Sequence, residues 1–370
     1  MSNLKQNVEE IVGLLRCVSC GGTHLEMRRS DPLPAEWSKL KFALAEQHLC
    51  CPSCGARFPV SEDGIPILWT DMIKGMLLSA GSAHKQQKGD EFAAVYSNIT
   101  SYDRISDDYA ANWRKSGDLI ERLRVAARRL LSSERNKNSV RHLDVGCGPG
   151  HVIEWLKPLS LTSVGLDVSL NNLRNARKGT GAHVVLGDAT NMPFKDKAFE
   201  LVTGSAILHH IYDWQMAIVE SCRVCSPEGG VVYDSEPTVE SLDLSPIARA
   251  VFEARWPVYK LLSYFLPSKR HFRNAQLAKQ YYYSAEVHNQ PGRGISIKEV
   301  EASFGRGGFN PEIFLSPSIQ LTSREQIGAR EAGWKRIVLQ VLSGHDPRAA
   351  KYGSFTVLAR PVSITEPTGK

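Results

Sequence analysis

The segment from Leu143 to His151 reads LDVGCGPGH, and it constrains the fold more than any other part of the chain. Apolar residues typical of a strand enter it, three glycines follow, and a helical pattern leaves it. Glycine tolerates backbone angles that other residues resist and has no Cβ, so such a turn lets a ligand approach the backbone. The dinucleotide fingerprint G-x-G-x-x-G has glycine at its sixth position, where this chain has His151. The segment therefore predicts a ligand-binding turn between a strand and a helix, for a ligand other than a dinucleotide.

Acidic residues accompany this turn and the two strands that follow it. Asp144 would repel a pyrophosphate but attract an ammonium group, Asp167 closes the next apolar strand, and Asp188 follows the one after. A carboxylate accepts hydrogen bonds from both hydroxyls of a ribose, and Asp188 suits an adenine amino group. Because the carboxyl ends of parallel strands lie at one edge of a sheet, we expect these groups along one ligand-binding edge. The pattern favours S-adenosylmethionine over NAD.

Five segments share their order with a known family. They are LDVGCGPG (143–150), GLDVS (165–169), GDATNMPF (187–194), FELVTGSAILHHI (199–211) and CRVCSPEGGVVYDSEP (222–237). Together they resemble the class I S-adenosylmethionine-dependent methyltransferases of the type 11 group. The resemblance implies that the amino-acid end of the cofactor contacts Asp144, Gly146, Gly148 and Gly150. It implies that the ribose contacts Asp167, that the adenine contacts Asp188 and Ala189, and that Ser205 lies near the sulfonium.

The same resemblance implies an α/β fold, a Rossmann-like and mostly parallel seven-stranded sheet with helices on both faces. We expect the methyltransferase domain over residues 91–363, after a linker over 73–90 and before a flexible tail over 364–370. The family pattern does not predict residues 236–294, which are rich in aromatic residues. Insertions at this edge of a sheet lie above the cofactor, so we expect a helical lid here. Its aromatic side chains either contact a flat or apolar acceptor or pack the lid onto the body.

Two Cys-x-x-Cys pairs near the start of the chain indicate a metal site. Cys17 pairs with Cys20, and Cys51 with Cys54, and a glycine trails each pair so that both thiolates can face one ion. Zinc takes four such ligands in a closed tetrahedron and stabilises a segment too short to build its own core. The loop between the pairs exceeds the ~15–20 residues usual for this spacing, which an insertion over residues 31–47 explains. The sequence therefore predicts a structural zinc ion.

Residues 58–68, after the second pair, resemble the zinc ribbon of Trm112-like proteins and of some bacterial ribosomal RNA methyltransferases. They indicate two short strands joined at Asp63 and Gly64. The resemblance implies a ribbon domain over residues 1–72 that offers a protein partner a docking site. Disulfides, an iron–sulfur cluster and redox chemistry are the alternatives for its cysteines. No apolar signal segment begins the chain, so we expect a cytoplasmic, reducing location, which disfavours disulfides.

Other cysteines fit structural roles. Cys147 is a small apolar residue within the crowded glycine turn, and a third pair, Cys222 and Cys225, continues a helical pattern and is expected to face the core. The remaining composition is that of an ordinary globular protein, with 42% hydrophobic and 23% charged residues. No apolar run reaches the ~18 residues of a membrane span. A net charge of +6 over 370 residues does not by itself indicate nucleic-acid binding.

His209 and His210 follow the fourth strand, at the edge where an acceptor would arrive. The sulfonium methyl is already activated, so the enzyme has mainly to align the acceptor with it and exclude water. A histidine suits the task of removing a proton from the acceptor, although a structural role remains the alternative.

Three functions are consistent with these features. The first is a methyltransferase acting on a small-molecule or metabolite acceptor. The second is a ribosomal or transfer RNA methyltransferase whose ribbon grips the nucleic acid. The third is a non-catalytic binding protein that keeps the fold.

Overall fold

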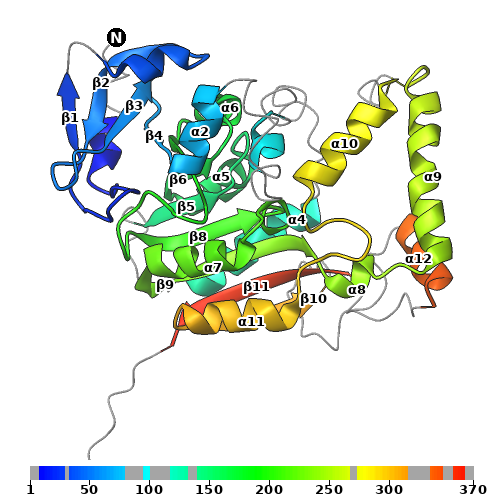
Figure 1. Cartoon of the computed structure of the whole chain (residues 1–370). Coiled ribbons are helices and arrows are strands. Elements are labelled where there is room, and N and C mark those ends of the chain that lie inside the picture. The colour runs from blue at the N-terminus through cyan, green and yellow to red at the C-terminus, as the bar shows by residue number, and fades with distance from the viewer. Residues whose placement is uncertain are drawn as a thin grey trace, which may run out of the picture.

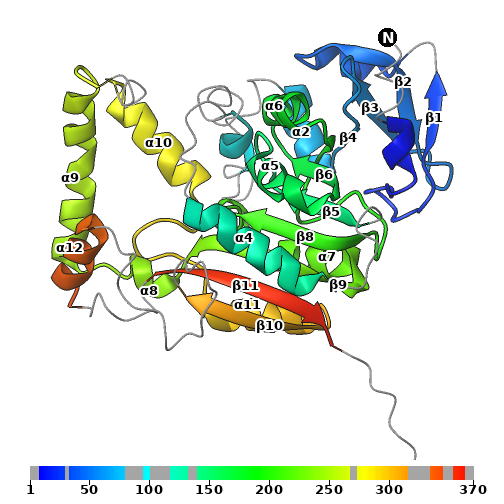
Figure 2. The ribbon, with the colours of Figure 1, turned by 180° about the vertical axis from the view of Figure 1, so that it is seen from behind.

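The computed structural model of the chain describes residues 8–29, 33–79, 95–100, 117–131, 140–266, 273–315, 334–344 and 353–362. The described part consists of a central sheet between two layers of helices, a small sheet at the N-terminal side, and a group of helices that projects at the opposite side (Figure 1). Figure 2 shows the same arrangement from behind, with α4 in front of the sheet.

The central sheet has eight strands among the described residues. In order across the sheet they are β10 (Phe309–Leu315), β11 (Ser354–Pro361), β9 (Cys225–Pro237), β8 (Phe199–Ser205), β5 (Arg141–Val145), β6 (Thr162–Asp167), β7 (His183–Gly187) and β4 (Ile67–Leu68). Strand β11 pairs antiparallel with both of its neighbours, and the other pairs are parallel. The prediction of a mostly parallel Rossmann-like sheet is confirmed.

The predicted strand number was one too low. Strands β5 to β11 are the seven that were expected, and β4 from the N-terminal segment adds an eighth beside β7. An edge strand leaves backbone groups that a neighbouring segment can pair with. Ile67 and Leu68 pair with the backbone of β7, and their side chains are fully buried in the hydrophobic core.

Helices cover both faces of the sheet, as predicted. On one face lie α4 (Gly117–Leu130), α5 (His151–Leu156) and α6 (Leu170–Thr180), and on the other lie α7 (Trp214–Val224) and α11 (Ile297–Arg306). The central strands are apolar on both sides because both faces are covered: Leu143, Val184 and Val202, for example, are fully buried. Because β5 to β8 are parallel, their carboxyl ends lie at one edge of the sheet. The site residues predicted from the sequence lie at or near this edge.

The N-terminal segment forms an antiparallel sheet of β1 (Glu26–Arg29), β2 (Leu44–Cys50) and β3 (Arg57–Ser61), with the short helix η1 (Ala35–Lys39) between β1 and β2. The expected turn follows β3: Gly64 donates to the Ser61 carbonyl, and Val60 forms an antiparallel bridge with Pro66. Leu15 bridges to Phe194, and both belong to one hydrophobic core that extends through the central sheet. The N-terminal segment and the central sheet are thus packed as one body.

Helix α2 (Asp71–Ser79) occupies the first part of the segment expected to be a linker over 73–90. Residues 80–90 and the tail over 364–370 lie outside the described residues. The domain limits at 72, 90 and 363 therefore remain predictions.

The insertion over 236–294 is helical, with α8 (Val239–Leu242), α9 (Pro246–Leu262) and α10 (Ala275–Ala285). Helix α12 (Trp334–Leu342) packs against α9 (Figure 1). The aromatic rings of Phe252 and Trp256 on α9 contact Tyr282 on α10, and the Arg255 guanidinium lies 3.6 Å from the Phe252 ring centroid. These contacts tie α9 and α10 together within the lid, whereas Tyr264 and Phe265 are exposed. Neither of the two roles expected for the lid aromatics, contact with an acceptor or packing onto the body, is tested by these contacts.

Candidate functional site

The four cysteines expected to bind metal come together. Sγ of Cys17 lies 3.6 Å from that of Cys54, and Sγ of Cys20 lies 3.7 Å from that of Cys51. All four sulfurs are within 4.8 Å of one another. Four thiolates around zinc at ~2.3 Å lie about 3.8 Å apart in a tetrahedron, so the spacing fits this ion. Cys50 stays outside the cluster, buried at the end of β2.

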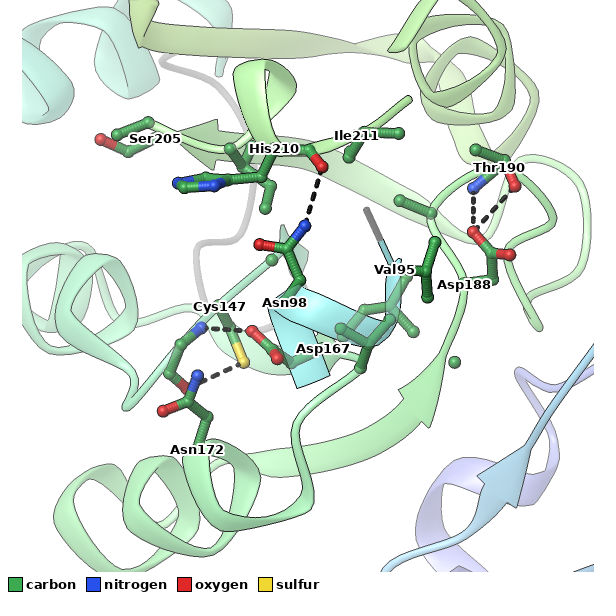
Figure 3. A pocket seen from close by; sticks show the side chains of 18 of the residues that line it. Val95, Asn98, Cys147, Asp167, Asn172, Asp188, Thr190, Ser205, His210 and Ile211 are labelled. Carbon is green, nitrogen blue, oxygen red and sulfur yellow. Dashed lines mark hydrogen bonds between the residues drawn. The ribbon is translucent and has the colours of Figure 1, made fainter. Parts of the chain in front are cut away.

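A pocket opens at the carboxyl edge of the central sheet. The glycine turn, Asp167, Asp188, Ala189 and Ser205 line it, together with His210 (Figure 3). Ser205 and His210 lie on one side, Asp167 and Asn172 on another, and Asp188 on a third. Of the residues predicted to bind the cofactor, Gly146, Gly148, Asp167, Asp188, Ala189 and Ser205 thus share one pocket.

Asp167 closes β6 beside the glycine turn. Its Oδ2 accepts from the backbone N–H of Gly148 at 2.8 Å (Figure 3). Its Oδ1 accepts from the backbone N–H of Ser169 at 2.8 Å. These bonds hold the turn and the start of α6 against one carboxylate. A carboxylate can accept hydrogen bonds from both hydroxyls of a diol. The geometry therefore suits a carboxylate that accepts from a diol.

Asp188 follows β7 on the other side of the pocket. Both the backbone N–H and the hydroxyl of Thr190 donate to its Oδ1 at 2.8 Å. No described donor bonds its Oδ2 in this arrangement. The carboxylate is thereby oriented and can accept from a ligand N–H with the second oxygen.

Asp144, Gly150 and His209 were also predicted as site residues but do not line this pocket. Asp144 is buried in β5, where its Oδ1 accepts from the Thr203 hydroxyl at 2.8 Å and its Oδ2 has no partner among the described residues. Burial raises the pKa of this carboxyl to about 7. Gly150 caps the N-terminus of α5, the helix that follows the turn.

His209 and His210 lie side by side on the short helix η5 (Leu208–His210), with ring centroids 4.2 Å apart. Nδ1 of His209 lies 2.8 Å from Oε2 of Glu236, and Nδ1 of His210 lies 2.9 Å from the carbonyl of Ala285. Burial would lower the pKa of His209, but the Glu236 carboxylate, and after it Glu286, raise it above its ordinary value. Burial and the nearby His209 lower the pKa of His210. Of the two histidines, His210 lines the pocket and His209 does not.

Several pocket or site residues have no motif that would have identified them. Asn172 on α6 lines the pocket, and its buried Oδ1 has no partner in the described part of the chain. Val95 and Asn98, in the helical residues 95–100, also line it, and Asn98 donates to the His210 carbonyl (Figure 3). Glu236 belongs to the matched segment 222–237, at the end of the fifth strand of the family pattern. An acidic residue at a strand end was the sequence feature that could have indicated its place in the site.

The other cysteines occupy the predicted structural positions. Cys147 lies under the glycine turn, where burial, with Asp167 and Asp144 nearby, raises the pKa of its thiol well above the ordinary value. Cys222 and Cys225 are buried in the hydrophobic core. No helix in the described ranges has both the length and the apolar character needed to cross a bilayer.

Residues 143–233 match the family described as "Methyltransferase domain". The chain is 29% identical to a demethylmenaquinone methyltransferase of Staphylococcus haemolyticus over 198 residues, which is 50% of this chain and 76% of that protein. It is 30% identical to the demethylmenaquinone methyltransferase of Staphylococcus epidermidis, over 42% of this chain and 66% of that protein. It is 25% identical to that of Staphylococcus aureus, over 61% of this chain and 88% of that protein.

The solved structures that match this chain include a chain of the complex between the Haloferax volcanii Trm112 methyltransferase activator and a methyltransferase. It has a TM-score of 0.44 and 14% identity, and the match covers 72% of this chain and 98% of that chain. An S-adenosylmethionine-dependent methyltransferase from Mesorhizobium loti has a TM-score of 0.38 and 18% identity, over 64% of this chain and 96% of that chain.

Proposed function

We propose that this chain, a class I S-adenosylmethionine-dependent methyltransferase, transfers the methyl group of its cofactor to a small-molecule acceptor. The acceptor class is supported by the sequence relatives, whose names give demethylmenaquinone as the compound that they methylate.

The observation that carries the cofactor assignment is the set of acceptor atoms at the carboxyl edge of the sheet. Asp167, Asp188 and Asn172 come from three different segments, and all three line the same pocket. The buried Oδ1 of Asn172 lacks a donor among the described residues, which a ligand with N–H or O–H groups would supply. S-adenosylmethionine offers a ribose diol, an adenine amino group and an ammonium group. We assign the ribose to Asp167 and the adenine to Asp188 and Ala189.

The amino-acid end is assigned to the glycine turn and to Asp144 beneath it. A carboxylate oxygen that is buried without a donor costs free energy, and an ammonium group nearby would offset that cost. The contact of Ser205 with the sulfonium region belongs to the same proposal.

His209 and His210 act, in this proposal, on the acceptor and not on the cofactor. With the cofactor bound, an acceptor lone pair would form the bond to the methyl carbon while the carbon–sulfur bond breaks with its electrons on sulfur, and a protonated acceptor would lose its proton to solvent or a nearby base. The protein's own part is to hold the acceptor in line with that bond and to exclude water. We expect His209→Ala or His210→Ala to slow transfer without weakening S-adenosylmethionine binding. Unchanged turnover in both variants would remove the histidines from the mechanism.

We also propose that Cys17, Cys20, Cys51 and Cys54 hold one structural zinc ion. The sulfur spacing supports it, and Cys17 and Cys51 are fully buried within the shared core. Loss of the ion would therefore loosen the packing of this segment against residues 191–195, to which Arg16 and Val18 are hydrogen-bonded.

Calorimetry with S-adenosylmethionine and its demethylated product tests the cofactor site. We expect 1:1 binding, weakened about 10- to 100-fold in Asp167→Asn, because a hydrogen bond to a charged group contributes ~1.5–3 kcal/mol. The control Asp196→Asn changes an exposed carboxylate that pairs with Arg223, and it should bind as the wild type does. Equal affinity in wild type and Asp167→Asn would contradict the assignment of the ribose.

Labelled cofactor tests the acceptor class. The enzyme is incubated with small quinols in one reaction and with ribosomal and transfer RNA in another. Label in the quinol fraction supports the proposal, and label only in RNA would replace it with an RNA methyltransferase.

A further inference from the structure

Three side chains with metal-binding atoms converge beside the pocket. His209 and His210 come from η5, and Glu286 directly follows α10. Nε2 of His209 lies 3.5 Å from Oε2 of Glu286, and Nε2 of His210 lies 4.0 Å from Oε1 of Glu286. Both separations exceed the ~2.7–3.2 Å of an N–H···O hydrogen bond. One ligand atom from each residue nevertheless lies within 4.8 Å of the other two, which is the spacing of atoms around a common ion.

The opposite nitrogens of both rings are held by acceptors. His209 Nδ1 is 2.8 Å from the buried Glu236 carboxylate, and His210 Nδ1 is 2.9 Å from the Ala285 carbonyl. A histidine that binds metal commonly donates its second ring N–H to a carboxylate or to a backbone carbonyl, which orients the ring and directs the other nitrogen to the ion. Both rings have this arrangement, and in both the second nitrogen faces Glu286.

The neighbourhood of the three side chains is tightly built. Glu236 is fully buried and accepts from the backbone N–H groups of Ile207, Leu208 and His209, at 2.7, 2.9 and 3.2 Å. On the other side, Asn289 donates to Oε2 of Glu286 at 2.8 Å. The backbone N–H of His288 donates to the His209 carbonyl at 2.8 Å and ties the end of the lid to η5. The cluster therefore has supporting hydrogen bonds on both of the elements that form it.

The alternative to a metal ion is a protonated His209 that pairs with both Glu236 and Glu286. That alternative accounts for His209 but leaves the position of His210 unexplained. A carbonyl can only accept, so Nδ1 of His210 carries the proton in that bond. In the neutral ring Nε2 then presents a lone pair toward a carboxylate. A divalent cation between this nitrogen and the carboxylate would accept a lone pair from each.

We propose that His209, His210 and Glu286 bind a divalent transition metal ion at the acceptor end of the pocket. Two imidazoles and one carboxylate suit ions such as Zn²⁺, Fe²⁺, Co²⁺ or Mn²⁺, and three protein ligands leave positions for an exogenous oxygen. His210 also lines the pocket beside Ser205 and Ile207, so an open position would face the acceptor.

The role of the ion rests on the proposed methyl transfer, whereas its binding does not. A hydroxyl bound to a divalent ion has a lowered pKa and releases its proton to solvent. The oxygen lone pair then forms the bond to the methyl carbon, and the carbon–sulfur electron pair remains on the product thioether. The acceptor is thereby specified as a compound with an acidic hydroxyl, such as a phenol or an enol.

Zinc titration of the full chain tests the site. Protein with one equivalent of zinc in the cysteine cluster is titrated with Zn²⁺ in a calorimeter. We expect one further equivalent in the wild type and in His288→Ala, whose ring bonds the Tyr212 carbonyl outside the cluster. His210→Ala and Glu286→Ala should bind the further equivalent at least 100-fold more weakly. Both variants should retain S-adenosylmethionine binding, which separates failure of the metal site from failure of the cofactor site.

A second measurement does not depend on how the variants fold. An anomalous difference map at the zinc edge, from wild-type crystals soaked in Zn²⁺, should place a peak between the two imidazoles and the carboxylate. A wild type that takes up no second equivalent, or a second ion bound away from these side chains, would overturn the proposal.

Discussion

Replacing Gly146 with alanine should disturb the glycine turn in two ways that the structure separates. The φ angle of Gly146 is +63°, and a Cβ built there would lie 2.2 Å from Cγ1 of Ile207. Glu236 holds the Ile207 backbone, so only a change of the Ile207 side-chain rotamer could relieve the contact. A left-handed conformation costs ~1–2 kcal/mol for a residue with a Cβ, and overpacking typically costs ~1–3 kcal/mol. We expect Gly146→Ala to lower the free energy of unfolding by about 2–5 kcal/mol.

The assay is guanidinium unfolding followed by circular dichroism, with S-adenosylmethionine affinity measured in parallel. Gly181→Ala is the matched control, because its φ is +75° but no neighbouring atom lies within 4 Å of the added Cβ. The free energy of unfolding of Gly181→Ala should fall only by the cost of the left-handed backbone conformation, about 1–2 kcal/mol. Equal losses in Gly146→Ala and Gly181→Ala would refute the argument from the contact with Ile207.

A double variant isolates the contact. Ile207→Ala removes the two atoms nearest to the added Cβ and leaves Cβ of residue 207 at 3.1 Å. The combined variant should therefore be more stable than the two single losses predict, by ~0.5–3 kcal/mol. Additive losses would show that Ile207 is not the obstacle.

Two further predictions concern buried charges. Arg122→Met should lower the free energy of unfolding by ~3–5 kcal/mol, because it leaves the fully buried Asp234 without the guanidinium that now donates to both of its oxygens at 2.6 and 2.8 Å. Arg129→Met breaks an exposed pair with Glu312 and should cost less than ~1 kcal/mol in the same denaturation assay; a similar loss in both would contradict this reasoning. For Asp144, burial raises the carboxyl pKa from 3.8 to about 7, so the folded state retains a proton that the unfolded chain loses. The stability of the wild type relative to Asp144→Asn should therefore fall as pH rises from about 4 to about 7 in denaturant titrations, and a constant difference would mean that Asp144 is ionised in the fold.

Much of the fold was readable from short patterns. The glycine turn, the carboxylates that close β6 and follow β7, and the alternation of strands and helices each depend on a few adjacent residues. The rule that parallel strands share one carboxyl edge then brought Asp167, Asp188 and Ser205 together correctly. The two cysteine pairs were equally local, since each pair lies in one tight turn in which the glycine after the second cysteine donates to the carbonyl of the first.

Other features had no local pattern to reveal them. Glu286 lies at the end of the lid and reaches the histidines only because α10 returns to η5. Nothing in residues 67–68 indicates that they complete the central sheet, since a two-residue apolar segment fits many positions. Asn172 lies in the sequence of an ordinary helix, and only the packed structure shows that it lines the pocket.

The sequence by itself determined those elements in which neighbouring residues supply both the conformation and the chemistry: the turn at 146–150, the cysteine pairs, and the strands with their terminal carboxylates. Only the tertiary structure decided which distant segments meet, namely β4 with β7, and Glu236 and Glu286 with the histidine pair. The physical reason is that local conformation depends on backbone angles and hydrogen bonds within a few residues, whereas contacts between distant segments depend on which buried surfaces fit together, and that fit is a property of the whole packed chain.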